Sequence, residues 1–184
     1  MAHSGPIFSH IGLYVTDMDR MVSFYTATMS FYVTDRGSLN GASITFLSRD
    51  PSEHHQLVFV GGRTVDRSTK LLNQMSFRLG SLGELIHFVK RLPKEDVSDL
   101  EPVFHGNAWS LYFRDPEGNR IEVFADSEWY IPQPIKEYLD FNLGEEEIRR
   151  RTYGFCKDQP GFQLFSEWRS SMEELMSKNS SNGA

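Results

Sequence analysis

The sequence contains an internal repeat, and this repeat restricts the folds open to the chain more than any other feature. The segment HIGLYVTDMDRMVSFY begins at His10, and QMSFRLGSLGELIHFV begins at Gln74. In both, a short alternating stretch and a turn precede apolar residues at the i, i+3, i+4, i+7 spacing of a helix buried on one face. Each apolar helix position of the second copy lies 64 residues after its counterpart, as Leu82 does after Met18. A fixed offset predicts two copies of one structural unit.

Three strands are predicted after each helix, because alternating apolar segments are separated there by turn-forming residues. We place them at about 30–36, 42–48 and 55–61 in the first copy, and at about 101–105, 109–114 and 120–125 in the second. The sequence therefore predicts an α+β fold of two tandem βαβββ modules within residues 1–126. The modules span about 8–61 and 73–125 and are joined by a polar linker, 62–72.

The remaining residues, 127–184, form an extension with predicted helices at 144–152 and 164–177. Aromatic side chains are frequent in this extension, and they must be buried against the modules or against a second copy of the chain. We therefore expect a homodimer.

Charge and composition exclude several classes of partner. The net charge of -6 argues against a nucleic-acid or anionic-membrane partner, since neither tolerates an acidic binding face. The lone Cys156 excludes an internal disulfide and fits a reducing compartment. No stretch approaches the roughly 18 apolar residues of a transmembrane helix. These observations predict a cytoplasmic protein.

Strand alternation predicts where polar side chains converge. The apolar residues of the first strand share one face, so His10 lies on the opposite, polar face. Gln74 holds the equivalent position in the second copy, and Glu122 lies on the polar face of the last strand.

Three segments resemble the vicinal oxygen chelate superfamily: HIGLYVTDMDRMVSFYTATMSF, EHHQLVFV and, above all, WSLYFRDPEGNRIEVF. This superfamily includes glyoxalase I, extradiol ring-cleaving dioxygenases, and fosfomycin and bleomycin resistance proteins. The resemblance covers roughly residues 7–126, and its last two segments are most similar to the extradiol enzymes. It implies that the two modules form an open, cup-like barrel around a divalent metal ion.

The resemblance also implies a set of site residues. The metal ligands would be His10, Gln74 and Glu122. Extradiol enzymes use two histidines and a glutamate, so Gln74 departs from their pattern, although glyoxalase I uses a glutamine beside histidine and glutamate. Fe(II) is the expected metal, with Mn, Ni or Zn as alternatives. The resemblance further implies catalytic roles for His55, His105 and Tyr112.

Ordinary structural roles compete with these assignments. Gln74 has the alternative of a hydrogen bond to Ser76, and Glu122 that of a salt bridge to Arg120 or Arg78.

Three functions therefore remain open. The first is an extradiol-type dioxygenase that cleaves a small catecholic aromatic compound with O₂. The second is a redox-neutral, glyoxalase-like isomerase or lyase. The third is a non-catalytic binding protein of the resistance type.

Overall fold

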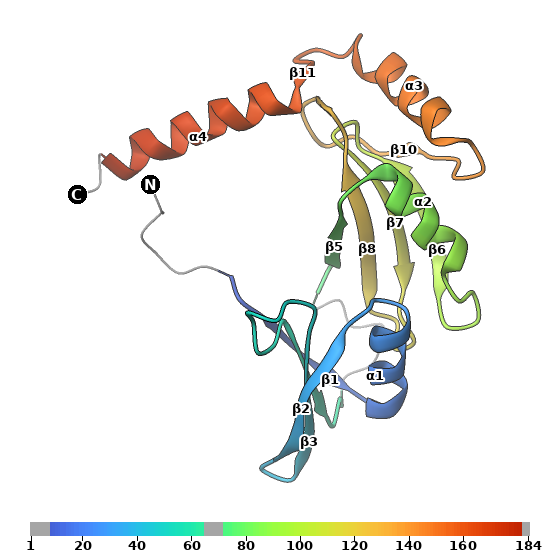
Figure 1. The fold of residues 1–184 in the computed structure, drawn as a ribbon, viewed down its shortest axis with the longest axis vertical. Coiled ribbons are helices and arrows are strands. Elements are labelled where there is room, and N and C mark those ends of the chain that lie inside the picture. Colours follow the sequence, from blue (N-terminus) through green and yellow to red (C-terminus); the bar gives the residue numbers. More distant parts are fainter. Residues whose placement is uncertain (1–7, 65–71, 182–184) are drawn as a thin grey trace.

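The computed structural model describes residues 8–64 and 72–181, and its two modules repeat one order of elements (Figure 1). The first module consists of β1 (Ile11–Val15), α1 (Met18–Ala27), β2 (Tyr32–Leu39), β3 (Ala42–Ser48) and β4 (Leu57–Gly61). The second consists of β5 (Met75–Leu79), α2 (Leu82–Arg91), β6 (Ser98–Phe104), β7 (Ala108–Arg114) and β8 (Arg120–Asp126). The predicted linker falls largely outside the described residues.

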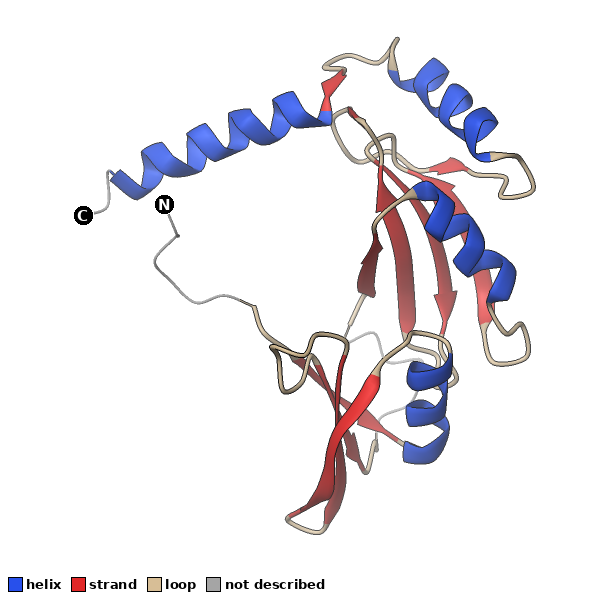
Figure 2. Cartoon of the chain, in the orientation of Figure 1, coloured by secondary structure: helices blue, strands red, loops and turns tan. Residues whose placement is uncertain are grey.

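Each module folds into a mixed sheet in which its first strand pairs with its last. The first sheet has the order β1-β4-β3-β2, with β1 parallel to β4. The second has the order β10-β6-β7-β8-β5, in which β10 (Glu137–Tyr138) comes from the extension and β5 is parallel to β8. This shared plan confirms the predicted α+β fold of two βαβββ units. The described strands form separate sheets and do not close into a barrel (Figure 2).

The helices begin where the sequence supplies caps. Asp17 caps α1 by accepting a hydrogen bond from the Arg20 N–H at 3.0 Å, and Ser81 caps α2 by accepting one from the Glu84 N–H at 3.2 Å. Such caps satisfy N–H groups that have no partner within the helix. The apolar stripes of both helices then join one hydrophobic core that continues across the two modules.

Buried polar contacts join the modules as well. The hydroxyl of Tyr25 on α1 donates to Asp115 Oδ2 at 3.1 Å in the turn between β7 and β8. In the same turn, Glu117 is 1% exposed and accepts from the backbone N–H groups of Thr16 and Asp17, each at 2.7 Å. The second module therefore holds the start of the first module's helix.

The extension adds elements that the sequence did not predict. β10 (Glu137–Tyr138) becomes a fifth strand of the second sheet, and β11 (Gln163–Leu164) pairs with β9 (Trp129–Tyr130). The predicted helices are present but longer, as α3 (Glu145–Cys156) and α4 (Phe165–Ser181). Strands of two residues leave no alternation to detect, which explains why they were missed.

The two helices of the extension, α3 and α4, differ in their contact with the modules. α3 packs on the second module, where the buried indole N–H of Trp109 donates to Thr152 Oγ1 at 2.8 Å. α4 extends away from the sheets as an arm (Figure 1). Among the described residues, no helix has the length and hydropathy needed to cross a lipid bilayer.

Candidate active site

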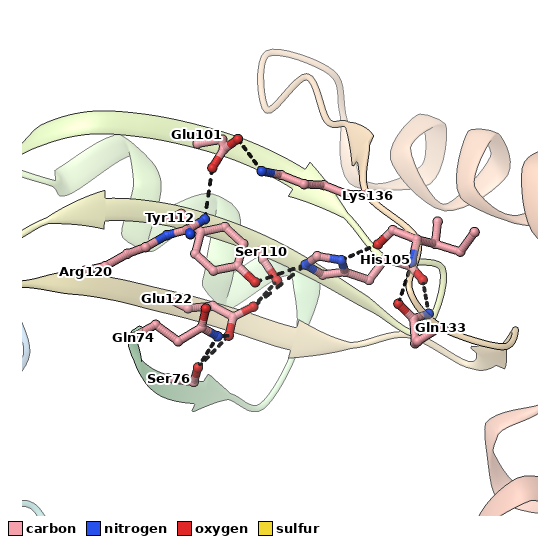
Figure 3. A network of polar contacts seen from close by, with 11 residues as sticks. Gln74, Ser76, Glu101, His105, Ser110, Tyr112, Arg120, Glu122, Gln133 and Lys136 are labelled. Atoms are coloured by element: carbon pink, nitrogen blue, oxygen red, sulfur yellow. Dashed lines mark hydrogen bonds and ion pairs between the residues drawn. The ribbon is translucent and has the colours of Figure 1, made fainter. Parts of the chain in front are cut away.

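A cross-strand row of polar residues forms the centre of the candidate site. Ser76 on β5 is the register partner of Glu122 on β8, and Glu122 is in turn the partner of Tyr112 on β7. Register partners on neighbouring strands point to the same face of a sheet. The pairing therefore explains why side chains from distant parts of the sequence meet here (Figure 3).

The carboxylate of Glu122 is the most heavily hydrogen-bonded group in this row. Glu122 is 8% exposed. Its Oε2 accepts from Gln74 Nε2 at 2.9 Å and from the Ser76 hydroxyl at 2.5 Å, and its Oε1 accepts from the Ser110 hydroxyl at 2.9 Å. A buried carboxylate is stable only when donors replace its water. Three donors do so here, and they confirm that Glu122 lies on a polar face.

Tyr112 and His105 extend the network beyond Glu122. The Tyr112 hydroxyl lies 3.1 Å from His105 Nε2, which is itself 3.9 Å from Glu122 Oε1. Burial, with a contribution from the Glu122 charge, raises the pKa of Tyr112 well above its ordinary value. The Arg120 guanidinium lies 4.4 Å from the centre of the Tyr112 ring. Because its pKa is raised, Tyr112 is a neutral phenol at physiological pH and can donate one hydrogen bond.

The salt-bridge alternatives for Glu122 do not occur. Arg120 pairs with Glu101 at 3.0 Å, and Arg78 lies 3.6 Å from Asp126. The alternative for Gln74 does occur, since its Nε2 lies 3.0 Å from the Ser76 hydroxyl in addition to its bond to Glu122.

His10 and His55 form a second, more exposed group. Their ring centroids are 4.3 Å apart, and His55 Nδ1 lies 2.9 Å from Nδ1 of the neighbouring His54. Desolvation, followed by the proximity of His10 and His54, lowers the pKa of His55. The sequence predicts that His55 starts the last strand of the first module. In the structure His55 lies before β4, because the connection after β3 continues to Gln56.

The structure does not join the two groups of polar residues directly. Within the described ranges, His10 contacts Ser9 and His55, and no hydrogen bond or ion pair links it to Gln74 or Glu122. A pocket of about 760 Å³ is lined by residues at the start of β1, among them Ser9 and Ile11, and by residues at the start of β5, among them Gln74 and Ser76. The structure thus brings together five of the site residues, Gln74, Ser76, His105, Tyr112 and Glu122, and keeps His10 and His55 in a separate pair.

The donor chemistry at Gln74 and Glu122 suits a divalent cation. In the described part of the chain, no three His, Cys, Asp or Glu side chains converge as a metal site, but the predicted set contains a glutamine. A carboxylate offers about four lone pairs, and in Glu122 they accept hydrogen bonds from Gln74, Ser76 and Ser110. The Gln74 amide donates through Nε2 to Ser76 and Glu122, and His10 is exposed. The donor types of Glu122, Gln74 and His10 are ones that divalent metals use, and the structure joins Glu122 with Gln74 but not with His10.

Sequence reasoning missed several residues of the site. Ser110 lies on β7 and completes the hydrogen bonding of Glu122. Gln133 and Ile135 belong to the extension, yet both bond to His105: Gln133 Nε2 donates to its backbone oxygen at 2.6 Å, and the Ile135 oxygen lies 2.6 Å from its Nδ1. No local pattern signals contacts that bridge about 30 residues, although the alternation of β7 places Ser110 on the face of Tyr112.

Comparison with known proteins places this geometry in context. Residues 7–123 match the family model described as the Glyoxalase/Bleomycin resistance protein/Dioxygenase superfamily. A relative from Rhodococcus globerulus, named biphenyl-2,3-diol 1,2-dioxygenase 3, is 29% identical over 146 residues, which cover 77% of this chain and 72% of the relative.

Two solved structures show the same fold. A glyoxylase/bleomycin resistance protein/dioxygenase domain from Frankia sp. EAN1pec aligns with a TM-score of 0.56 and 23% identity, covering 68% of this chain and 100% of that chain. A mutant of the fosfomycin resistance protein FosX from Listeria monocytogenes, complexed with Mn(II) and 1S,2S-dihydroxypropylphosphonic acid, aligns with a TM-score of 0.53 and 19% identity. That alignment covers 68% of this chain and 95% of FosX.

Proposed function

The chain belongs to the glyoxalase/bleomycin resistance protein/dioxygenase superfamily, and from this membership we propose that it is a metal-dependent, extradiol-type dioxygenase that cleaves a catecholic ring with O₂. The observation that carries the proposal is the meeting of Tyr112, His105 and Glu122 on one face of the second sheet. The Rhodococcus relative supports the substrate class, because the diol in its name is a vicinal aromatic diol.

The proposed metal ligands are Glu122, Gln74 and His10. Members of the superfamily bind divalent metals, as the Mn(II) complex of FosX illustrates. We propose Fe(II) for this chain, because activation of O₂ requires a metal that can transfer electrons. A bound divalent iron would supply that chemistry and would favour ionisation of a bound hydroxyl.

The other residues act on the substrate and its protons. Tyr112 keeps its proton at physiological pH, and its hydroxyl group can form a hydrogen bond with a hydroxyl group of the substrate. His105 orients that hydroxyl from 3.1 Å. His55 is the proposed acid–base residue, because its lowered pKa leaves the imidazole neutral and able to accept a proton. We also propose that the chain forms a homodimer and that it is located in the cytoplasm.

The direct test combines metal content with oxygen uptake. Protein loaded with Fe(II) under anaerobic conditions is mixed with a panel of catechols, and O₂ consumption is compared with that of free iron. We expect at least one catechol to give stoichiometric ring cleavage, measured as a coloured or mass-shifted product. Consumption no greater than that of free iron across the panel contradicts the proposal.

Ligand variants test the site without relying on turnover. Glu122→Ala and His10→Ala are each expected to remove tight Fe(II) binding, measured by mass spectrometry of the purified protein. Gln74→Ala should weaken binding less, since a neutral amide oxygen is the weakest donor, and Gln74→His should strengthen it. Gln163→Ala, in the extension, is the matched control. Unchanged metal content in both Glu122→Ala and His10→Ala shows that the site lies elsewhere.

A redox-neutral isomerase or lyase is the second candidate, and Gln74 favours it. An amide is a harder donor than the imidazole found at this position in extradiol enzymes, so it suits metals that polarise a carbonyl without redox change. Turnover of a carbonyl substrate in the absence of O₂ would identify this activity, and strictly oxygen-dependent turnover would exclude it.

A further inference from the structure

The extension contacts the candidate site through the ring of His105. Nδ1 of this ring lies 2.6 Å from the backbone oxygen of Ile135, and Nε2 lies 3.1 Å from the Tyr112 hydroxyl. Both ring nitrogens therefore have a partner, one from the extension and one from the site (Figure 3). The two partners differ in chemistry, because a backbone carbonyl can only accept a hydrogen bond, whereas a hydroxyl can donate or accept.

This difference determines where the proton of the neutral ring resides. A contact of 2.6 Å between Nδ1 and the Ile135 oxygen is a hydrogen bond only if Nδ1 carries the hydrogen. Nε2 of the neutral ring then holds a lone pair and accepts the hydroxyl hydrogen of Tyr112. In the other tautomer, the Nδ1 lone pair would face the carbonyl oxygen and repel it.

Gln133 holds the Ile135 carbonyl in place. Its Nε2 donates to the backbone oxygen of His105 at 2.6 Å, and its Oε1 accepts the Ile135 N–H at 3.0 Å. One side chain thus ties the backbone of the extension to the backbone of His105. The carbonyl that bonds to the ring is therefore fixed by a residue outside the two modules.

We propose that Gln133 is a positioning residue that fixes His105 in the Nδ1–H tautomer, and that Tyr112 consequently presents an acceptor oxygen to a hydroxyl group of the substrate. With its hydrogen directed to His105 Nε2, the Tyr112 hydroxyl keeps oxygen lone pairs that face the site. A substrate hydroxyl can donate to the Tyr112 oxygen, whereas a methoxy group or a carbonyl in that place cannot. This inference on substrate chemistry rests on the proposed function.

The tautomer can be observed directly, without metal or substrate. In nitrogen-labelled full-length protein, the chemical shifts of the two His105 ring nitrogens distinguish a protonated from an unprotonated nitrogen, and His105→Asn assigns the signals. We expect Nδ1 to be the protonated nitrogen of the neutral ring. Gln133→Ala should change the tautomer ratio roughly fivefold, which corresponds to the loss of a typical hydrogen bond. Gln163→Ala, the matched control in the same extension, should leave it unchanged.

Each outcome decides the inference. A neutral His105 protonated mainly at Nε2 in the unsubstituted protein overturns it, and this spectrum suffices even if Gln133→Ala fails to fold. A folded Gln133→Ala with an unchanged tautomer ratio overturns the role of Gln133. Oxygen uptake no greater than that of free iron for every catechol in the panel refutes the dioxygenase proposal. If the Nδ1–H tautomer is observed at the same time, the tautomer assignment stands.

Discussion

Glu117 provides a quantitative test of how the two modules hold each other. Its Oε1 accepts two backbone N–H groups at the start of α1, each at 2.7 Å, and its Oε2 lies 3.4 Å from the Arg63 guanidinium. The carboxylate also lies at the positive end of the α1 dipole. Glu117→Ala deletes all these interactions and leaves the largely buried Arg63 without its anionic partner. Breaking a buried ion pair by removing one partner costs about 3–5 kcal/mol.

Glu117→Gln separates the charge from the hydrogen bonds. The amide keeps an oxygen where Oε1 accepts both N–H groups, but neutral hydrogen bonds are roughly half as strong as charge-assisted ones. Each bond to a charged acceptor contributes about 1.5–3 kcal/mol, so halving both bonds predicts a loss of about 1.5–3 kcal/mol. Urea unfolding followed by fluorescence measures both values by linear extrapolation. Glu95→Ala, at an exposed loop position, is the control. A Glu117→Ala variant within about 0.5 kcal/mol of the unsubstituted protein, the usual range for surface changes, refutes the reasoning.

Three further predictions concern the extension. Thr152→Val should lower the unfolding free energy by about 1–3 kcal/mol, because the buried Trp109 N–H loses its acceptor, whereas Thr152→Ser should lose less in the same urea assay. Burial raises the pKa of the Cys156 thiol to about 11. At a pH of about 8.5, the ordinary pKa of a cysteine, the native thiol should therefore stay protonated and resist alkylation by iodoacetamide, reacting only once the chain is unfolded. Truncation after Asp126 uncovers Trp109 and removes β10, and should yield aggregated protein in size-exclusion chromatography.

The order of elements could be predicted from the sequence because it depends on local periodicity. The four apolar helix positions shared by the two copies identified α1 and α2, and alternation correctly placed Glu122 on the polar face of β8. The same alternation brought Gln74 and Glu122 together, because β5 and β8 are parallel neighbours in register.

What the sequence could not predict depends on how distant segments pack. Glu117 is a charged residue in a turn, where side chains are usually exposed to solvent. Packing of α1 against that turn nevertheless buries Glu117 almost completely. Gln133 likewise becomes part of the site only because β10 pairs with β6 and brings the preceding segment beside His105. His10 belongs to the first module and Glu122 to the second, so their separation depends on how the modules pack, which no single-strand pattern encodes.

The pairing of first and last strands within each module has a consequence for synthesis on the ribosome. β1 cannot be paired until β4 has emerged, so the first sheet stays incomplete until residue 61 is outside the exit tunnel. β5 waits in the same way for β8, which ends at Asp126. Parallel pairing between distant strands is slow because the intervening loop must close first. The two sheets are therefore expected to complete their pairing one after the other, and each leaves an unpaired β-strand exposed to chaperones until its last strand has emerged.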